Sequence, residues 1–335
     1  MPAASAPMAA RYLVSVLAGL AGSFVLFTTS LWALDHTGHL PPPAFANSLC
    51  ADEKLAFLRN HPVAAPNLLV VGSSVAWRHF DGETVAAQLP GTRPLNGAFC
   101  GLRANQAVYV AGWLLGREPS VRQVLMIVDP QDFAGCGAVP TAVFNRQDAD
   151  AYVYGNGSRW LPYARYFSPL SLLRNALSVK AQRADLIEFD PLVFDRYGDG
   201  PLNTPNSRGL TYAKADPLDP ACFTALRQLA TQLKGDGRAF TVVATPLHPQ
   251  WKTAYDPHNT LAAQFDRDLR QALAATGARF WNADAGHGYG AGAFIDAIHL
   301  RWAAAKVFSQ ALASHLGTPT PRSVAGSIPA EAPVN

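Results

Sequence analysis

A serine that follows a short apolar run is the first group in this chain whose position suggests chemistry. Residues 68–71 are apolar and lie between Pro66 and Gly72, a pattern typical of a strand buried on both faces. Such strands belong to parallel sheets, and open α/β sheets bind ligands at the carboxyl ends of their strands. Ser74 follows that end, where a helix can begin. It is either a nucleophile at the mouth of a cleft or a residue that only caps the helix.

The partners that a nucleophilic serine needs lie near the other end of the chain. A serine hydroxyl is a weak nucleophile at neutral pH and needs an adjacent base. Asp296 and His299 are three residues apart, and on a helical turn this spacing places both side chains on one face. The aspartate can then hold one imidazole nitrogen while the other nitrogen faces a serine. The competing interpretation is a capped helix start with a surface histidine.

The elements that would position these groups alternate along the chain. After the Ser74 loop we expect a helix over 81–89, a strand from 93, a helix over 104–115, a strand over 121–128, a helix over 223–233, a strand over 240–244, a helix over 261–275, a strand over 278–281 and a helix over 303–316. This order predicts an α/β fold, a three-layer sandwich around a mostly parallel, flavodoxin-like sheet. No Gly-x-Gly-x-x-Gly follows the first strand, which argues against a dinucleotide site.

The N-terminus predicts a membrane anchor. Residues 12–34 carry no charge and, as a helix, are long enough to cross a hydrocarbon core of about 30 Å. Arg11 precedes this run and Asp35 follows it, which places residues 1–11 in the cytoplasm. A cleaved signal peptide is the alternative, but its apolar core is shorter, about 7–15 residues. We therefore expect an uncleaved single-pass protein of a bacterial inner membrane, with its catalytic domain on the periplasmic or extracellular side.

Composition marks the remaining boundaries. Residues 35–66 read as a juxtamembrane linker and a short helix, and residues 67–316 as the α/β domain. Within that domain the alternation lapses over about 134–220, as in a long functional insertion. Its aromatic residues suit either the faces of sugar rings or a small satellite core; they are Tyr152, Tyr154, Trp160, Tyr163, Tyr166, Tyr197 and Tyr212. Residues 317–335 are rich in Pro, Ser and Ala, and we expect them to be disordered.

Charge and cysteine content exclude several classes of protein. The net charge of +3 and the absence of a basic run argue against a nucleic-acid partner. The four cysteines form no Cys-x-x-Cys pair, so a structural zinc site is not expected, whereas one or two disulfides would suit an exported domain. Their pairing stays open among Cys50, Cys100, Cys136 and Cys222. Because no histidine motif surrounds His79, His258 or His287, we expect no metal and no cofactor.

A strand followed by Gly-Ser-Ser early in the chain, and Asp-x-x-His followed by a helix late in it, resemble the sequence blocks of the SGNH (GDSL-like) hydrolase superfamily. The resemblance covers roughly residues 67–316. The first block of that family is Gly-Asp-Ser, and Gly72-Ser73-Ser74 matches it with Ser74 as the nucleophile. Ser73 occupies the aspartate position, which makes it the rival nucleophile if the register slips by one. The late Asp-x-x-His block implies that His299 is the base and that Asp296 orients it.

The resemblance also implies an oxyanion hole. The backbone N–H of Ser74 is its first donor, and Asn96 to Gly101 matches the second family block, which makes the Gly101 N–H the second donor. The third block, Gly-x-Asn-Asp, is matched poorly, because Gln131 stands where the asparagine should be. We also expect His248 and Trp251 to line the substrate site, since they follow the strand over 240–244 at the same end of the sheet.

The activity implied is that of a serine-dependent ester hydrolase or O-acyltransferase that forms an acyl-serine. Membrane-tethered members with long insertions resemble envelope polysaccharide O-acetylation proteins, which implies acetyl groups on an exported glycan as substrate and a membrane acyl-donor protein as a further partner. Whether water or a sugar hydroxyl attacks the acyl-serine stays open, as does an ordinary lipid or small-ester substrate. The alternative is a catalytically inactive scaffold or binding component of an envelope polysaccharide complex, which the altered first and third blocks would favour.

Overall fold

The computed structural model of the chain describes residues 6–184, 189–214, 216–285 and 288–317. His287 lies outside these ranges. So do the first five residues of the predicted cytoplasmic segment and all but the first residue of the predicted disordered tail.

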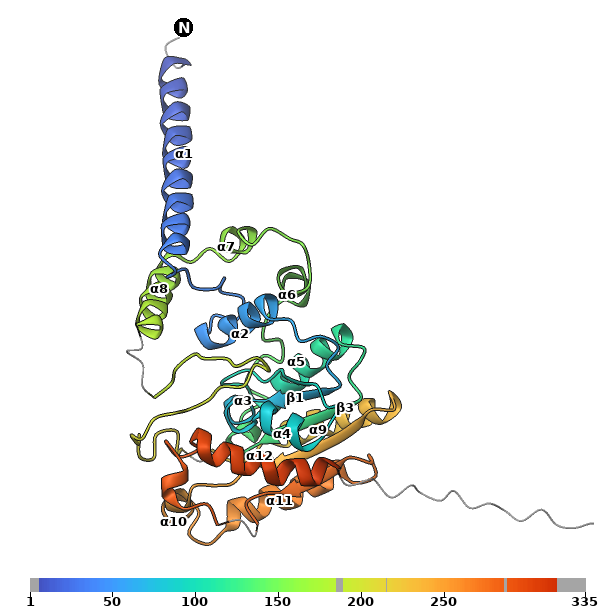
Figure 1. The fold of residues 1–335 in the computed structure, drawn as a ribbon. Helices are drawn as coiled ribbons and strands as arrows, with labels where there is room; N and C mark the ends of the chain where they lie inside the picture. The colour runs from blue at the N-terminus through green and yellow to red at the C-terminus, as the bar shows by residue number, and fades with distance from the viewer. Residues whose placement is uncertain (1–5, 185–188, 215, 286–287, 318–335) are drawn as a thin grey trace, which may run out of the picture.

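The described residues form an α/β domain around a parallel sheet, as expected (Figure 1). Five strands pair in the order β2-β1-β3-β4-β5. Every pairing between them is parallel. The strands are β1 (Leu68–Gly72), β2 (Pro94–Asn96), β3 (Gln123–Val128), β4 (Ala239–Ala244) and β5 (Arg279–Asn282). The carboxyl ends of all five strands therefore meet at one edge.

Helices cover both faces of the sheet. Leu69 and Val71 of β1 face one apolar cluster and Leu68 and Val70 face another, which explains why β1 is continuously apolar. The first cluster includes α2 (Leu49–Asn60), α5 (Ala104–Arg117), α9 (Pro220–Gly235) and α11 (Thr260–Leu273). The second includes α3 (Ser74–His79), α4 (Gly82–Gln88) and α12 (Trp302–Gly317).

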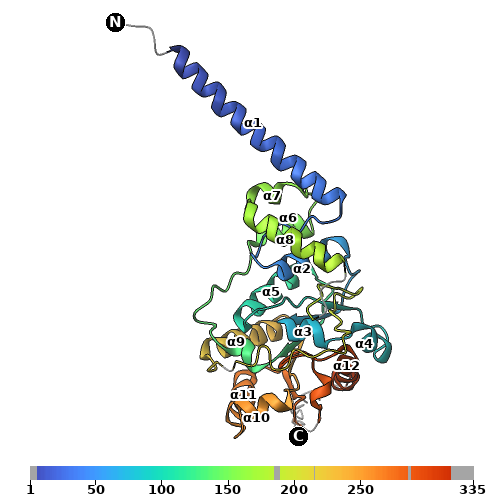
Figure 2. The same ribbon diagram turned by 90° about the vertical axis from the view of Figure 1, so that its left-hand side faces the viewer.

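An N-terminal helix projects away from this domain. Helix α1 (Ala6–His36) stands clear of the sheet in both views (Figures 1 and 2). Over Met8–His36 it is long and apolar enough to cross a membrane, and it buries none of its most apolar window against the domain. A signal sequence near the N-terminus can also meet this criterion of length and composition.

The insertion contains three helices that the sequence pattern did not predict: α6 (Arg146–Val153), α7 (Leu161–Arg165) and α8 (Pro169–Arg183). Helices α7 and α8 lie beside the base of α1 (Figure 2). The Tyr163 hydroxyl donates to the carbonyl of Pro41 (2.6 Å), and the Arg159 guanidinium pairs with Asp35 (2.6 Å). Much of the insertion is thus held by the juxtamembrane segment.

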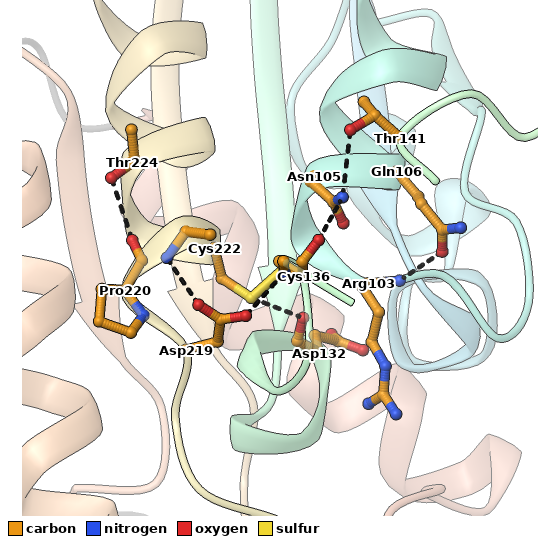
Figure 3. The surroundings of a disulfide bond; sticks show 12 residues. Arg103, Asn105, Gln106, Asp132, Cys136, Thr141, Asp219, Pro220, Cys222 and Thr224 are labelled. Atoms are coloured by element: carbon orange, nitrogen blue, oxygen red, sulfur yellow. Dashed lines mark hydrogen bonds between the residues drawn. A yellow bond between two sulfur atoms is a disulfide. The ribbon is translucent and has the colours of Figure 1, made fainter. Parts of the chain in front are cut away.

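Two disulfides use all four cysteines. Cys50 in α2 bonds to Cys100 in the loop after β2. Cys136, which follows the short 3-10 helix η1 (Pro130–Phe133), bonds to Cys222 at the start of α9 (Figure 3). Near the second bond, the Asn105 amide donates to the Cys136 carbonyl (3.1 Å).

Candidate active site

Ser74 is presented by a sharp turn at the end of β1. Gly72 has φ +142°, and a Cβ there would lie 2.5 Å from the carbonyl oxygen of Ile127 and 2.7 Å from the Cβ of Ala76. Glycine is therefore required where β1 turns into α3. Ser73 is the N-cap of α3 and its hydroxyl accepts the Val75 N–H (3.4 Å). Ser74 is then the first helical residue, at the carboxyl edge of the sheet.

The Asp296–His299 segment is a closed loop, so the predicted helical turn is wrong. An isolated antiparallel bridge joins Phe294 to Leu300 and pinches the loop shut. Inside it, Oδ1 of Asp296 accepts the backbone N–H groups of Ile298 and His299, both at 2.9 Å. The Asp296 carboxylate thus accepts backbone N–H groups that carbonyl oxygens would accept in a helix. Asp side chains commonly make such hydrogen bonds in turns.

His299 connects the two ends of the chain. Its Nε2 lies 2.9 Å from Oγ of Ser74, and its Nδ1 lies 2.9 Å from Oδ2 of Asp296. Burial would raise the pKa of Asp296, but the hydrogen bond and charge of His299 and the two N–H groups outweigh it and lower that pKa. An ionised Asp296 fixes a proton on Nδ1 and leaves Nε2 free to take the proton of Ser74.

Ser74 rather than Ser73 carries the hydrogen bond to the imidazole. The Ser73 side chain is buried and bonds to the Asp132 carboxyl as well as to the start of α3. Ser74 is only partly buried. The alternative register, with Ser73 as nucleophile, therefore has less support from the geometry.

A second histidine, His79, lies next to His299, with 6.4 Å between the ring centroids. The sequence pattern predicted no role for it. Nε2 of His79 accepts the Leu300 N–H (2.9 Å), so Nδ1 carries the proton and donates to Oγ1 of Thr245 (2.7 Å). Burial lowers the pKa of His79 well below 6.5, with the nearby His299 adding to the effect. A neutral His79 therefore holds the backbone immediately after His299 in place.

Ser74 and His299 open on a cavity of about 400 Å³. Gly101, with φ +71°, and Gln131 line the same cavity, as does the Cys50–Cys100 disulfide. The side-chain amide of Gln131 donates to the Tyr212 carbonyl, so one of its two N–H groups is engaged. The structure brings the predicted oxyanion residues to one cavity, and their role in stabilising an oxyanion stays a prediction.

Two acidic residues line the cavity where β3 ends. Asp129 caps η1 by accepting the Gln131 N–H (2.8 Å) and the Asp132 N–H (3.0 Å) through Oδ1. Its buried Oδ2 has no hydrogen-bond partner among the described residues. Burial raises the pKa of Asp129, and burial together with the charge of Asp129 raises that of Asp132 well above its usual value. Both shifts are opposed by the charge of Arg103, which lines the same cavity.

Tyr212 is the member of the aromatic insertion that lines the cavity. Its ring meets the His299 ring edge-on at 5.8 Å. Its backbone is left-handed, with φ +68°, a conformation that is strained in a bulky residue and recurs at functional sites. The sequence marked the aromatic-rich segment but gave no signal for this position.

His248 and Trp251 pack behind the site, and neither lines the cavity. Nδ1 of His248 accepts the Gln250 N–H at the start of α10 (Pro249–Tyr255). The Trp251 indole donates to the Ala213 carbonyl (3.0 Å) and clusters with Ala297, next to Asp296. The structure gives both residues a packing role, and their predicted contact with substrate is untested.

A buried carboxylate group lies elsewhere in the domain. Ligand oxygens of Asp81, Asp195 and Asp199 lie within 4.8 Å of one another. Asp199 is bonded to the Asn96 amide (2.7 Å) and the Gly82 N–H (2.6 Å). Burial raises its pKa well above the usual value. The Asn96 side chain is part of this hydrogen-bond network, and protein groups supply the partners of Asp199.

No protein-family model matches the chain, and no curated protein matches it.

Proposed function

We propose that this protein is a serine-dependent ester hydrolase or O-acyltransferase that works through an acyl-serine. The observation that carries the proposal is the unbroken series Ser74, His299 and Asp296, with 2.9 Å at each link. It lies at the carboxyl edge of a parallel sheet, where such folds bind ligands. It also opens on a cavity large enough for a small ester or a sugar ring.

The chemistry follows from the positions of the protons. His299 accepts the Ser74 proton through Nε2 while Oγ attacks the ester carbonyl. The ionised Asp296 stabilises the imidazolium, which then protonates the departing alkoxide. In the second half, His299 deprotonates water or an acceptor hydroxyl, which attacks the acyl-serine and releases Ser74. The N–H groups of Ser74 and Gly101 are the proposed donors to the oxyanion.

Two features of the sheet accompany this site. The strand order 2-1-3-4-5 is that of flavodoxin-like sheets, and helices from two separate apolar clusters cover the two faces. These features support a three-layer sandwich of the SGNH type.

The substrate we propose is an acetyl ester on an exported cell-envelope glycan, with a membrane acyl-donor protein as a further partner. The apolar α1 supports anchorage in a membrane, and two disulfides suit the periplasmic or extracellular side. The cavity wall is mixed in character, with Arg103, Asp129 and Tyr212 beside apolar Leu102 and Leu192. Polar groups beside an aromatic ring suit a sugar that carries an acyl group.

An inactive scaffold of an envelope polysaccharide complex is the second candidate. The observation that favours it is the Gln131 side chain, which donates one of its two amide N–H groups to the Tyr212 carbonyl instead of the cavity. A site with one fewer oxyanion donor loses about 10²–10³-fold in rate in measured cases.

The two candidates are separated by trapping the acyl-enzyme. The full chain in detergent is mixed with p-nitrophenyl acetate, and its intact mass is followed together with Ser74→Ala and Ser73→Ala. We expect one added acetyl group in the wild type and in Ser73→Ala, and none in Ser74→Ala, whose turnover falls about 10⁴-fold or more. Ser73→Ala is the matched control because it removes a neighbouring hydroxyl from the same turn.

An adduct in Ser74→Ala would show that the nucleophile is misassigned. A folded wild type with neither adduct nor turnover, on this ester and on acetylated xylan, would favour the scaffold.

A further inference from the structure

The face of α8 that points away from the domain carries three exposed leucines, with the exposed Arg174 among them. Leu170, Leu173 and Leu177 follow one another at helical spacing and are 82%, 61% and 61% exposed. The opposite face is the one that packs, through Asn175, Ala176 and Val179. A helix on the surface of a protein in water presents polar residues outward. Three large apolar side chains on the outer face of α8 depart from that rule and indicate that part of this face is covered by something other than water.

The apolar surface continues beyond α8. Phe167, in the turn before α8, is 57% exposed, and Leu161, at the start of α7, is 66% exposed. We call these two residues together with Leu170, Leu173 and Leu177 the α7–α8 apolar surface. Monomeric proteins rarely expose large apolar side chains in such concentration without a partner.

The position of this surface identifies the partner. The Phe167 ring meets the ring of Phe27, in α1, edge-on at 5.0 Å. Phe27 is seven residues before Leu34, the last residue of the uncharged run, which corresponds to about 10 Å along a helix. When α1 spans a bilayer, Phe167 therefore lies at the depth of the acyl chains. Both views show α8 at the base of α1 (Figures 1 and 2).

Charge changes along α8 in the same direction. At its far end the Arg183 guanidinium lies against Gly38, just beyond the end of α1. The exposed Arg174 and Lys180 are two further basic residues of this helix. The Leu170 end of α8 thus lies beside α1, and the end that carries Lys180 and Arg183 lies at the level where lipid headgroups begin, as in interfacial helices.

We propose that the α7–α8 apolar surface inserts into the leaflet nearest the domain and forms a second contact with the lipid bilayer, independent of α1. The inference rests on α1 as a membrane anchor and not on the acyl chemistry. Lipid is favoured over a protein partner because the surface is continuous with the anchor and is accompanied by basic residues.

Site-directed spin labelling tests the proposal on the full chain. All four native cysteines are paired, so a single introduced cysteine takes the label alone. Three variants are compared in nanodiscs that contain anionic lipid: Leu20→Cys in α1, Leu170→Cys in α8, and Thr224→Cys on the exposed side of α9. Collision of the nitroxide with oxygen reports lipid, and collision with a water-soluble nickel chelate reports water.

We expect labels at positions 20 and 170 to collide mainly with oxygen and a label at position 224 to collide mainly with the nickel chelate. The ratio of the two collision rates should differ by about tenfold or more between these two groups. Position 20 should be the deepest in the bilayer. A water-exposed label at 170 with a lipid-exposed label at 20 would overturn the proposal. A label at 170 that is shielded from both reagents would overturn it in favour of a second copy of the chain. A water-exposed label at 20 would show that α1 does not span the bilayer and would overturn the proposed insertion of the α7–α8 apolar surface as well. The acetyl adduct at Ser74 is a separate readout, so failure of one proposal is distinguishable from failure of the other.

Discussion

The carboxylate of Asp296 performs two tasks with two oxygens. Oδ1 closes the loop by accepting two backbone N–H groups, and Oδ2 faces Nδ1 of His299. An asparagine can keep the first task, but its NH₂ group would face Nδ1 and select the other imidazole tautomer. The loop and the chemistry can therefore be separated by one isosteric change.

We predict that Asp296→Asn lowers kcat on an acetyl ester about 10⁴-fold, as tautomer loss does in serine hydrolases, with little change in KM. Steady-state kinetics measure the effect, and near-UV circular dichroism checks that the loop is intact. A decrease of less than about tenfold in a folded variant would mean that Asp296 serves only the loop.

His79 provides a prediction of pH dependence. Burial lowers its pKa well below 6.5 in the folded protein, so below pH 6.5 the unfolded chain binds more protons than the folded one. The free energy of unfolding therefore falls as the pH falls below 6.5, by at most about 1.4 kcal/mol per pH unit for one group. His79→Gln removes this dependence.

Urea unfolding of the wild type and His79→Gln at pH 7.5 and pH 5 measures the difference. We expect the wild type to lose more stability than the variant over this interval. The exposed His258 supplies the control, because His258→Gln should follow the wild type. Parallel curves for all three proteins would show that His79 is not the group that senses acid.

At the scale of elements, the Cys50–Cys100 bond joins the linker helix α2 to the loop that carries Gly101. Both sulfurs belong to cavity-lining residues, whereas neither Cys136 nor Cys222 lines the cavity. The two bonds close loops of similar size, with separations of 50 and 86 residues. The two disulfides should therefore contribute similarly to the stability of the protein but differ in their effect on the site.

We predict that Cys50→Ser/Cys100→Ser and Cys136→Ser/Cys222→Ser each cost about 2–4 kcal/mol of stability. Only the first pair should also reduce kcat, by about tenfold or more, because it frees a proposed oxyanion donor. Denaturant unfolding and ester turnover at a temperature where both variants are folded measure the two effects. Equal kcat values for the two variants would contradict a link between the first bond and the site.

The three central strands, β1, β3 and β4, could be predicted from sequence because each is a mostly apolar run with turn-forming or polar residues at its ends. The α7 and α8 helices could not, because the leucines of α8 face outward and break the pattern expected of a helix that packs on a core. The spacing of Asp296 and His299 fits both a helical turn and a bend capped by the aspartate, so it predicted their proximity but not their backbone. His79 and Tyr212 gave no local signal, since their contacts with the His299 loop come from distant parts of the chain.

At the scale of the whole molecule, α1 and residues 37–43 hold the insertion, whereas α2, which follows them, packs on the sheet. The contacts are the Phe27–Phe167 ring pair, the Asp35–Arg159 ion pair and the Tyr163–Pro41 hydrogen bond. A partly exposed ion pair contributes only about 0–1 kcal/mol. Removing the segment should therefore loosen one region and leave the core intact.

We predict that deletion of residues 1–43 changes the melting temperature by less than about 3 °C, since the core of the domain is untouched, and that it speeds amide exchange over residues 159–183. Hydrogen exchange with mass spectrometry measures both regions in one experiment, with β3 as the internal reference. A uniform increase in exchange that includes β3 would mean that residues 1–43 stabilise the whole domain.

The two disulfides also define an order of events during synthesis. Any chain emerges from its N-terminus, so Cys50, Cys100, Cys136 and Cys222 become available in that sequence. Each bond joins a cysteine to the next one that emerges. An oxidant that links thiols strictly in order of appearance therefore produces the native pairs, and this chain has no need of an isomerase to reshuffle them.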